Sequence, residues 1–250
     1  MTFRDHFSAA ARLYADRRPT YPPALVAWVA GLVGRRGRAW DCGTGSGQAA
    51  VALAAHVAHV DATDASAAQL AHARQHPRVT YHAARAESSA LRGGSVSLVT
   101  VAQALHWFDA GAFFAEARRV LAPGGALAAW SYGDPTLGDP ALDAVLRAYA
   151  RGTLGPWWPA ERRLVDEGYR SIDFPFREVE APAFTLEHAW TLAELAGYLR
   201  SWSATLRLQA AAGGDPVAAV EAALRPLWGA PDARRAVRWP VSMRAGHAGA

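Results

Sequence analysis

Cysteine is almost absent from this sequence, since Cys42 is the only one among its 250 residues. A single thiol excludes an intramolecular disulfide framework, zinc sites of the CxxC type and an iron–sulfur cluster held by cysteine ligands. The chain also lacks a run of about 18 apolar residues, which a transmembrane helix requires, and a basic and then apolar cleavable leader. These absences predict a cytoplasmic protein that has no membrane partner.

Lysine is absent altogether, so arginine supplies all 26 basic side chains and the formal net charge is +4. The arginines are scattered as single residues and short pairs, such as Arg35 with Arg36 and Arg234 with Arg235. Such pairs are typical of solvated faces, whereas a nucleic-acid site concentrates positive charge on one stripe. We therefore expect no nucleic-acid partner, despite the positive net charge.

Apolar residues make up 51% of the sequence, which is enough for a chain of this length to bury a sizeable core. Their spacing alternates between strand and helix patterns as far as residue 132, which indicates an α/β fold with a doubly wound parallel sheet. We expect five strands in this part, including residues 38–40, 95–102, 126–130 and a strand that ends at Asp64. Later strands at 176–186 and 237–245 predict a final antiparallel hairpin.

The second half of the chain has helical patterns at 134–170 and 189–229 and is rich in aromatic residues. Thr191 and Glu194 have the spacing of a capping box, and Asp215 with Pro216 is a second helix-start signal. These segments predict a helical cap over the sheet.

The most informative stretch is the glycine turn, which we define as residues 41–47 (DCGTGSG), between an expected strand and an alanine-rich helix. Glycine accepts positive φ and lets a ligand approach the backbone, and the start of the following helix presents unpaired N–H groups. Asp64 lies 17 residues beyond Gly47, where the next parallel strand ends and its carboxylate can accept bonds from ribose hydroxyls. The turn therefore predicts a site for a nucleotide cofactor.

The spacing of the glycines also separates cofactor classes. The dinucleotide pattern GxGxxG would need a glycine at position 48, which is Gln48, so the pattern here is GxGxG. A NAD-dependent enzyme is therefore a distant alternative. No metal site is predicted, because the spaced pairs His56 with His59 and His72 with His76 have no carboxylate or cysteine converging on them.

Four separated motifs resemble those of class I methyltransferases that use S-adenosylmethionine (SAM), of the small-molecule type related to trans-aconitate methyltransferases. They are the glycine turn with Asp64, the YxxxRPxYP run at 14–22, the QALHWF run at 103–108, and Trp239–Pro240. The resemblance covers nearly the whole chain. It implies a Rossmann-like, seven-stranded methyltransferase sheet, with SAM as cofactor and S-adenosylhomocysteine as its product.

The resemblance also implies four regions within a single structural domain. Residues 1–23 would form an N-terminal lid segment, and residues 24–132 the SAM-binding core. Residues 133–175 would be a cap insertion, and residues 176–250 would hold the last two strands with intervening cap helices.

Carried over residue by residue, the resemblance assigns the cofactor contacts. Gly43, Gly45 and Gly47 would lie under the methionine part of SAM, Asp41 near its amino group, and Asp64 on the ribose hydroxyls.

The far end of the cofactor is assigned in the same way. Ala86 and Glu87 would border the adenine, although Arg85 stands where family members often have an acid or an amide. Gln103, at the end of the fourth strand, would lie where cofactor and substrate meet.

His106 is the candidate catalytic residue, because it follows Gln103 closely and an imidazole can accept a proton from a hydroxyl or amine at neutral pH. A hydrogen bond to a loop is the other interpretation of this histidine. If the acceptor is a carboxylate, no base is required, and Arg17 or Arg18 would orient it through a bidentate pair.

Candidate substrate-binding residues combine one arginine with aromatic side chains from the lid, the QALHWF run and the cap: Tyr14, Arg18, Tyr21, Trp107, Trp157 and Trp202. Aromatic residues in a small helical cap also form its core, so a packing role is the alternative for each of them.

The nature of the acceptor is narrowed by two further observations. The Asp/Asn-Pro-Pro-Tyr motif used on exocyclic base amines is absent, and Cys42 lies inside the cofactor turn, where it cannot attack a pyrimidine ring. We expect methylation of a small molecule, most readily at an oxygen, by a monomer or homodimer. Transfer to nitrogen or carbon, and a SAM-binding sensor without turnover, remain the alternatives.

Overall fold

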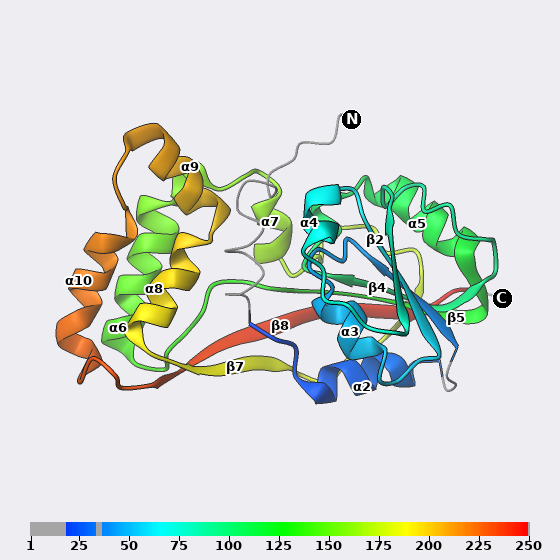
Figure 1. The fold of residues 1–250 in the computed structure, drawn as a ribbon, viewed down its shortest axis with the longest axis horizontal. Helices are drawn as coiled ribbons and strands as arrows, with labels where there is room; N and C mark the ends of the chain where they lie inside the picture. Colours follow the sequence, from blue (N-terminus) through cyan, green and yellow to red (C-terminus); the bar gives the residue numbers. More distant parts are fainter. Residues whose placement is uncertain (1–18, 34–36, 250) are drawn as a thin grey trace.

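The computed structural model describes residues 19–33 and 37–249. A twisted β-sheet runs along the molecule, with helices on both faces at one end and a group of helices at the other (Figure 1). This arrangement confirms the predicted α/β class. In the described part of the chain, no helix is long and apolar enough to cross a membrane.

Seven strands lie side by side in the order β3-β2-β1-β4-β5-β8-β6, and an eighth, β7, pairs with β8. The first five strands pair in parallel, and β8 is antiparallel to both of its neighbours in the sheet. Their bounds are β1 (Arg38–Cys42), β2 (His59–Asp64), β3 (Val79–Ala83), β4 (Val96–Ala102), β5 (Leu121–Tyr132), β6 (Arg177–Val179), β7 (Thr185–Trp190) and β8 (Arg235–His247). The seven-stranded order with an antiparallel last strand confirms the predicted sheet.

Apart from the edge strand β3, the parallel strands are largely buried on both faces, as expected where helices connect parallel strands. Alternate residues of β4 belong to different cores, because Leu98 packs with one cluster and Val99 with the other. Helices α2 (Pro23–Gly31) and α3 (Gln48–Leu53) contribute to the first cluster, and α5 (Ala110–Val120) contributes to the second. Between β2 and β3 lies the short α4 (Ala67–Ala71).

The expected single strand at 176–186 is wrong, because the structure has two strands there. Pro182 lies between β6 and β7 and has no N–H with which to continue a ladder. Both strands pair with β8, with Val179 opposite Ala245 and Thr185 opposite Pro240. The C-terminal half of β8 therefore pairs with the main sheet, and its N-terminal half pairs with β7 and reaches the cap (Figure 1).

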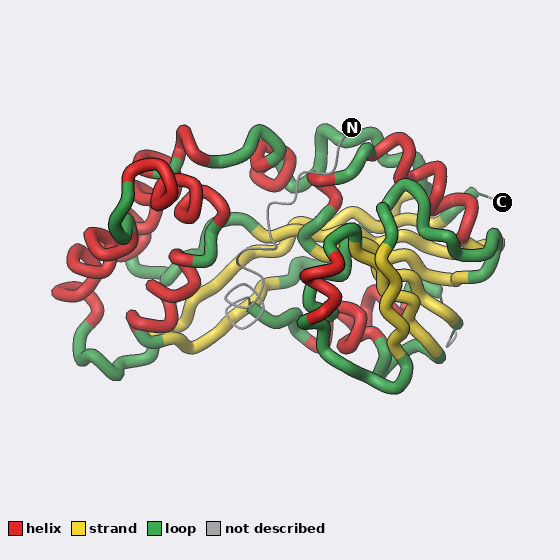
Figure 2. The backbone as a smooth tube through the Cα atoms, turned by 45° about the horizontal axis from the view of Figure 1, so that its top comes forward, coloured by secondary structure: helices red, strands yellow, loops and turns green. Residues whose placement is uncertain are grey.

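The cap is the group of helices at the opposite end of the sheet from the parallel strands (Figure 2), and its helices come from two separate segments of the chain (Figure 1). Its core contains Leu142, Tyr198 and Trp228 from helices together with Leu186 from β7 and Trp239 from β8. The predicted capping box is confirmed at the start of α8. The cap helices are α6 (Pro140–Arg147), α7 (Arg162–Asp166), α8 (Leu192–Arg200), α9 (Ser203–Ala212) and α10 (Val217–Trp228), with the single turns η3 (Ala148–Thr153) and η4 (Gly155–Trp157). The boundaries of the four expected regions stay predictions.

Candidate active site

The glycine turn follows β1 directly and has the backbone that its sequence predicts. Gly43, Gly45 and Gly47 have φ values of +68°, +55° and +78°, a region that residues with a Cβ rarely adopt. Gly47 is also the N-cap of α3, so the turn ends at the start of a helix. The Thr44 N–H donates to the Thr63 carbonyl at 2.9 Å, which ties the turn to the end of β2.

The space around the three glycines differs. A Cβ on Gly43 would lie 2.6 Å from the Cβ of Ala104, and one on Gly47 would lie 2.2 Å from the Tyr81 hydroxyl. A Cβ on Gly45 would meet no described atom nearer than the Gln69 Oε1, at 4.0 Å. The turn therefore packs closely against its surroundings at both ends and is open at its centre.

Asp41 is fully buried at the end of β1, directly before the turn. Its Oδ2 accepts a hydrogen bond from the Thr44 hydroxyl at 2.6 Å, and its Oδ1 accepts one from the Thr100 hydroxyl at 2.7 Å. Burial raises the pKa of this carboxyl to about 6, although both hydrogen bonds oppose the change. A cation held beside the turn would favour the ionised carboxylate.

Asp64 closes β2 and connects the glycine turn to the start of α4. Its Oδ2 accepts the Gly45 N–H and its Oδ1 accepts the Ser66 N–H, each at 2.8 Å. A carboxylate oxygen has two lone pairs, so each oxygen can accept a ligand hydroxyl in addition to its backbone donor. Asp64 thus has a structural role in the turn, which its spacing alone did not predict.

Two buried amide atoms lie beside the glycine turn and have no hydrogen-bond partner among the described residues. They are the Gln69 Oε1 and the Gln48 Nε2. Gln69 is only 4% exposed, and Gln48 is the first residue of α3. Buried polar atoms are normally paired, so an acceptor and a donor left over at one turn fit a polar ligand.

The expected adenine border lies after β3. Ala86 is buried, whereas Glu87 is engaged by protein groups. The Glu87 Oε1 accepts the Asp109 N–H at 3.1 Å, and its Oε2 pairs with the Arg85 Nε at 3.2 Å. Arg85, which stands where an acid or an amide was expected, is thus paired with Glu87. Glu87 in turn links the segment after β3 to the start of α5.

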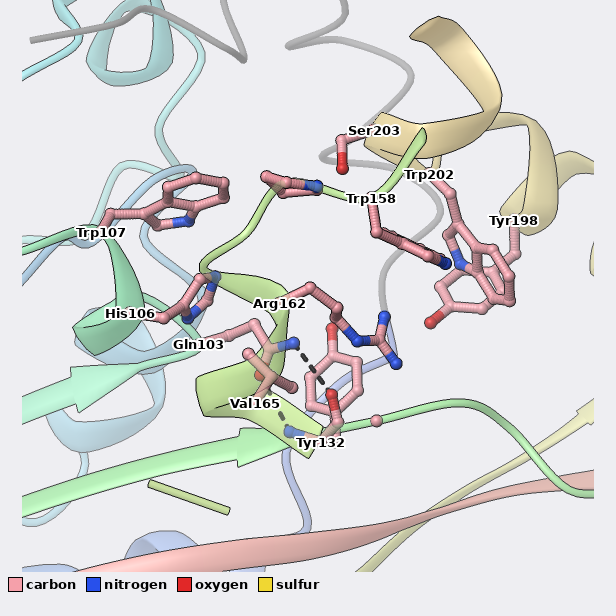
Figure 3. A pocket seen from close by; sticks show the side chains of 12 residues that line it. Gln103, His106, Trp107, Tyr132, Trp158, Arg162, Val165, Tyr198, Trp202 and Ser203 are labelled. Carbon is pink, nitrogen blue, oxygen red and sulfur yellow. Dashed lines mark hydrogen bonds between the residues drawn. The ribbon is translucent and has the colours of Figure 1, made fainter. Parts of the chain in front are cut away.

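Gln103 lies immediately beyond β4 and has a left-handed backbone, with φ of +57°. Its side-chain amide makes two bonds to the backbone of Tyr132, with Nε2 donating to the carbonyl at 3.0 Å and Oε1 accepting the N–H at 2.8 Å. The amide thus continues the pairing of β4 and β5 by one further step (Figure 3). A strained backbone held by such bonds is a common feature of functional sites.

His106 lies in a single 3-10 turn between β4 and α5 and is 8% exposed. Its Nδ1 lies 3.0 Å from the Tyr169 hydroxyl oxygen. The His106 ring also contacts the ring of Trp107, with centroids 4.7 Å apart. The hydrogen bond to a loop that the sequence left as an alternative is therefore present, and it is made at Nδ1.

A pocket lies between this end of the sheet and the cap. Figure 3 shows His106 and Trp107 on one side, Trp158, Trp202 and Tyr198 on the other, and Arg162 between them. Four of the predicted site residues line it: Gln103, His106, Trp107 and Trp202. The other lining residues are Tyr132, Gly133, Trp158, Pro159, Arg162, Val165, Tyr198 and Ser203.

The remaining predicted substrate residues have other surroundings. Tyr21 packs edge-on against Trp130, with ring centroids 5.4 Å apart, and joins the cap core to a sheet core. Trp157 packs against the cap core and is not among the residues that line the pocket. Tyr14 and Arg18 lie outside the described residues.

Arg162 is the pocket residue that sequence analysis missed most clearly. Its Nη2 pairs with Asp134 at 2.7 Å, its Nε pairs with Asp166 at 2.8 Å, and its guanidinium lies over the Trp158 ring at 4.4 Å. Arg151 pairs with the same two aspartates. Two arginines and two aspartates balance one another, so the arginine lines the pocket without adding a net charge.

Among the described residues, no group of three His, Cys, Asp or Glu side chains is arranged to hold a metal ion.

Comparisons with known proteins agree with this geometry. A family model described as a methyltransferase domain matches residues 40–129, from β1 to β5. A Dictyostelium discoideum protein described as a methyltransferase is 33% identical over 204 residues, which are 80% of this chain and 78% of that protein.

Solved structures are similar over most of the chain. One, described as a type II methyltransferase from Anaeromyxobacter dehalogenans, is 45% identical, has a TM-score of 0.86 and matches over 92% of this chain and 97% of that one. Another, from Bacillus halodurans, is 20% identical with a TM-score of 0.51, over 90% and 97% of the two chains, and is similar in fold alone. The chain therefore belongs to the class I SAM-dependent methyltransferases.

Proposed function

We propose that this methyltransferase transfers the methyl group of SAM to an oxygen atom of a small molecule. The proposal is carried by one observation, which is that the glycine turn and the pocket meet beyond the end of β4. Gly43 packs against Ala104, and the pocket is lined by Gln103, one position before Ala104, and by His106, two positions after it. A group held by the turn and a molecule in the pocket would therefore be neighbours.

The residues of the turn fit SAM as their ligand. Asp41 would face its amino group and Asp64 its ribose hydroxyls, and the buried atoms of Gln48 and Gln69 supply a donor and an acceptor beside the open centre of the turn. The buried Ala86 would lie against the adenine. When bound, SAM supplies a methyl group on a sulfonium, a good leaving group that an acceptor lone pair can displace.

The pocket supports a small-molecule acceptor. Aromatic side chains form much of its lining, and its arginine is paired with Asp134 and Asp166. Such a lining favours a compact molecule that is mostly apolar over a polyanion such as nucleic acid. We propose that the enzyme acts on such a molecule in the cytoplasm, as a monomer or homodimer, and that it is related to trans-aconitate methyltransferases.

Oxygen is the proposed acceptor because His106 lines the pocket near the cofactor turn. An imidazole there can take the proton that a hydroxyl loses as it gains the methyl group. The protein's main contribution is to hold the acceptor oxygen in line at about 3–3.5 Å from the methyl carbon. An amine or a carbon acid in the same pocket would be the alternative acceptor.

Calorimetric titration with SAM and with S-adenosylhomocysteine tests the cofactor half of the proposal. The same sample is then incubated with methyl-labelled SAM and a pooled metabolite extract, and labelled products are identified by mass spectrometry. We expect binding of both ligands and a product labelled at oxygen.

The other outcomes separate the alternatives. A product labelled at nitrogen or carbon would replace the proposed acceptor atom, and binding without any product would favour a sensor. Absence of binding to either ligand would contradict the proposal as a whole.

A further inference from the structure

Tyr169 connects the segment after α7 to the active site through a hydrogen bond with His106. It lies three residues beyond α7, is fully buried, and reaches the Nδ1 of His106, which is 63 positions earlier in the chain. The two rings are roughly parallel, with an interplanar angle of 26° and centroids 6.1 Å apart. A tyrosine that packed only as an apolar side chain would not need this contact.

The backbone at Tyr169 is held in an unfavourable conformation. Its φ is +62°, in the left-handed region, and the preceding Gly168 has φ of +59°. The Tyr169 N–H donates to the Leu164 carbonyl at 2.8 Å, and the Arg244 guanidinium donates to the Tyr169 carbonyl at 3.1 Å. Strain of this kind persists where surrounding contacts fix it, and it often occurs at functional sites.

Arg244 extends this support into the sheet. It belongs to β8, its side chain is 14% exposed, and it also donates to the Ile172 carbonyl and pairs with Glu178 of β6. The position of the Tyr169 hydroxyl is therefore set by the central sheet as well as by α7.

We propose that Tyr169 is a positioning residue for His106. The His106 Nδ1–H donates to the Tyr169 hydroxyl oxygen, so Nε2 is the nitrogen with the lone pair. This inference rests on the proposed function, in which the acceptor oxygen gains the methyl carbon, loses its proton to Nε2, and leaves an imidazolium that Tyr169 still orients. Arg162 also lines the pocket, but its guanidinium is paired with Asp134 and Asp166.

The ring tautomer gives a test that is independent of turnover. In protein labelled with ¹⁵N-histidine, the His106 signals are assigned by their loss in His106→Gln among the nine histidines of the chain. At a pH where His106 is neutral, we expect a protonated Nδ1 and an unprotonated Nε2 in the wild type. The Tyr169→Phe variant should shift the population toward the Nε2–H form.

The chain offers a matched control for this substitution. Tyr149 is also a buried tyrosine of the cap, and its hydroxyl bonds to Thr205 at 2.9 Å. Neither residue lines the pocket, although the Tyr149 ring stacks on Trp202, which does. Tyr149→Phe removes the same oxygen at comparable burial and should leave the His106 tautomer unchanged.

Turnover supplies the second readout. We expect Tyr169→Phe to lower kcat about tenfold, less than the roughly 10²–10⁴-fold that a general base itself contributes, with the KM for the acceptor and the SAM affinity unchanged. In a His106→Gln background, the same substitution should have no further effect on kcat, whereas two independent structural lesions would multiply.

The outcomes keep the two proposals apart. Three outcomes would each overturn the role of Tyr169. They are a protonated Nε2 in the wild type, a tautomer that Tyr169→Phe does not change, and a further loss of kcat of about tenfold when Tyr169→Phe is added to His106→Gln. Failure to find any methylated product would count against the proposed function, while the tautomer measurement would still decide how Tyr169 acts on His106.

Discussion

The glycine turn and the pocket are neighbours, yet they are built in different ways. The turn consists of consecutive residues between β1 and α3, and the adjacent strand β2 fixes it through Thr63 and Asp64. The pocket is lined by side chains from four separate segments, at 103–107, 132–133, 158–165 and 198–203. The turn therefore depends on the sheet, whereas the shape of the pocket depends on how the cap packs against it.

The two regions also differ in charge. Asp41 and Asp64 place two carboxyl groups at the turn, which suits a ligand that carries positive charge. In the pocket, Arg162 is balanced by its two aspartates. One half of the site can thus retain a single cofactor while changes in the cap alter the acceptor.

The sharpest test of this division removes the imidazole from the pocket. We expect His106→Ala to lower kcat by about 10²–10⁴-fold, the usual contribution of a general base. SAM affinity, measured by calorimetry, should stay within about twofold of the wild type, because the turn is held by β1, β2 and α3. A parallel loss of SAM affinity would mean that the two regions are not separable, and a wild-type rate would leave His106 a structural role.

The next test strains the turn itself. A Cβ on Gly43 would meet the Cβ of Ala104, which cannot move unless the backbone moves. An alanine at position 43 would also have to adopt a positive φ. Gly43→Ala should therefore lower the free energy of unfolding by about 3 kcal/mol, measured by urea denaturation. Gly45→Ala is the matched control, since it has a similar positive φ but an open surrounding, and it should cost only about 1–2 kcal/mol. Equal losses would show that backbone strain alone accounts for the destabilisation and that the contact with Ala104 adds nothing.

Sequence alone predicted much of the turn, because its parts are local or lie at a fixed spacing. The GxGxG pattern requires positive φ, and Asp64 follows at the distance of one β-α-β unit, so neither depends on distant packing. The seven-stranded sheet with its antiparallel final part followed from the resemblance, and the strand at residues 237–245 followed from its alternation. The break at Pro182 was missed, although proline is itself a signal against a continuous strand.

The pocket was predicted only in part, for physical reasons. His106 and Trp107 could be identified because they follow β4 within a recognisable run. From the sequence, Arg162 would be expected on the surface and Tyr198 in the core. Only the packing of α7 and α8 brings both to one site. Tyr169 carried no signal in the sequence, since one of the bonds that hold its left-handed backbone comes from Arg244, in a strand 75 positions later.

A smaller effect is expected at the ribose side of the turn. Asp64→Ala should weaken SAM binding by about 1–3 kcal/mol, the cost of losing hydrogen bonds to a charged group, measured by calorimetry. Asp61→Asn is a suitable control, because Asp61 lies on the same strand and pairs with Arg38, outside the turn. Unchanged affinity in Asp64→Ala would contradict the ribose assignment, and an equal loss in both variants would point to damage of β2 rather than of the turn.

The smallest predicted effect is the pH dependence of SAM binding, which tests whether Asp41 meets positive charge. Burial raises the pKa of this carboxyl to about 6 from an ordinary value of 3.8, so it is largely protonated at pH 5 in the ligand-free protein. Binding a cation beside the carboxylate then requires loss of that proton, and affinity should rise about tenfold between pH 5 and pH 7 and level off above.

The raised pKa of Asp41 also makes folding stability depend on pH, in the opposite direction to SAM affinity. Because the folded state binds the proton more tightly than the unfolded chain, the contribution of Asp41 to stability is complete below about pH 4 and is lost as pH rises through 6. Wild-type protein without ligand should therefore lose stability over the range in which its SAM affinity increases. In Asp41→Asn both pH dependences should disappear together; if the variant retains the rise in affinity, another group at the site titrates and Asp41 does not face the cofactor's positive charge.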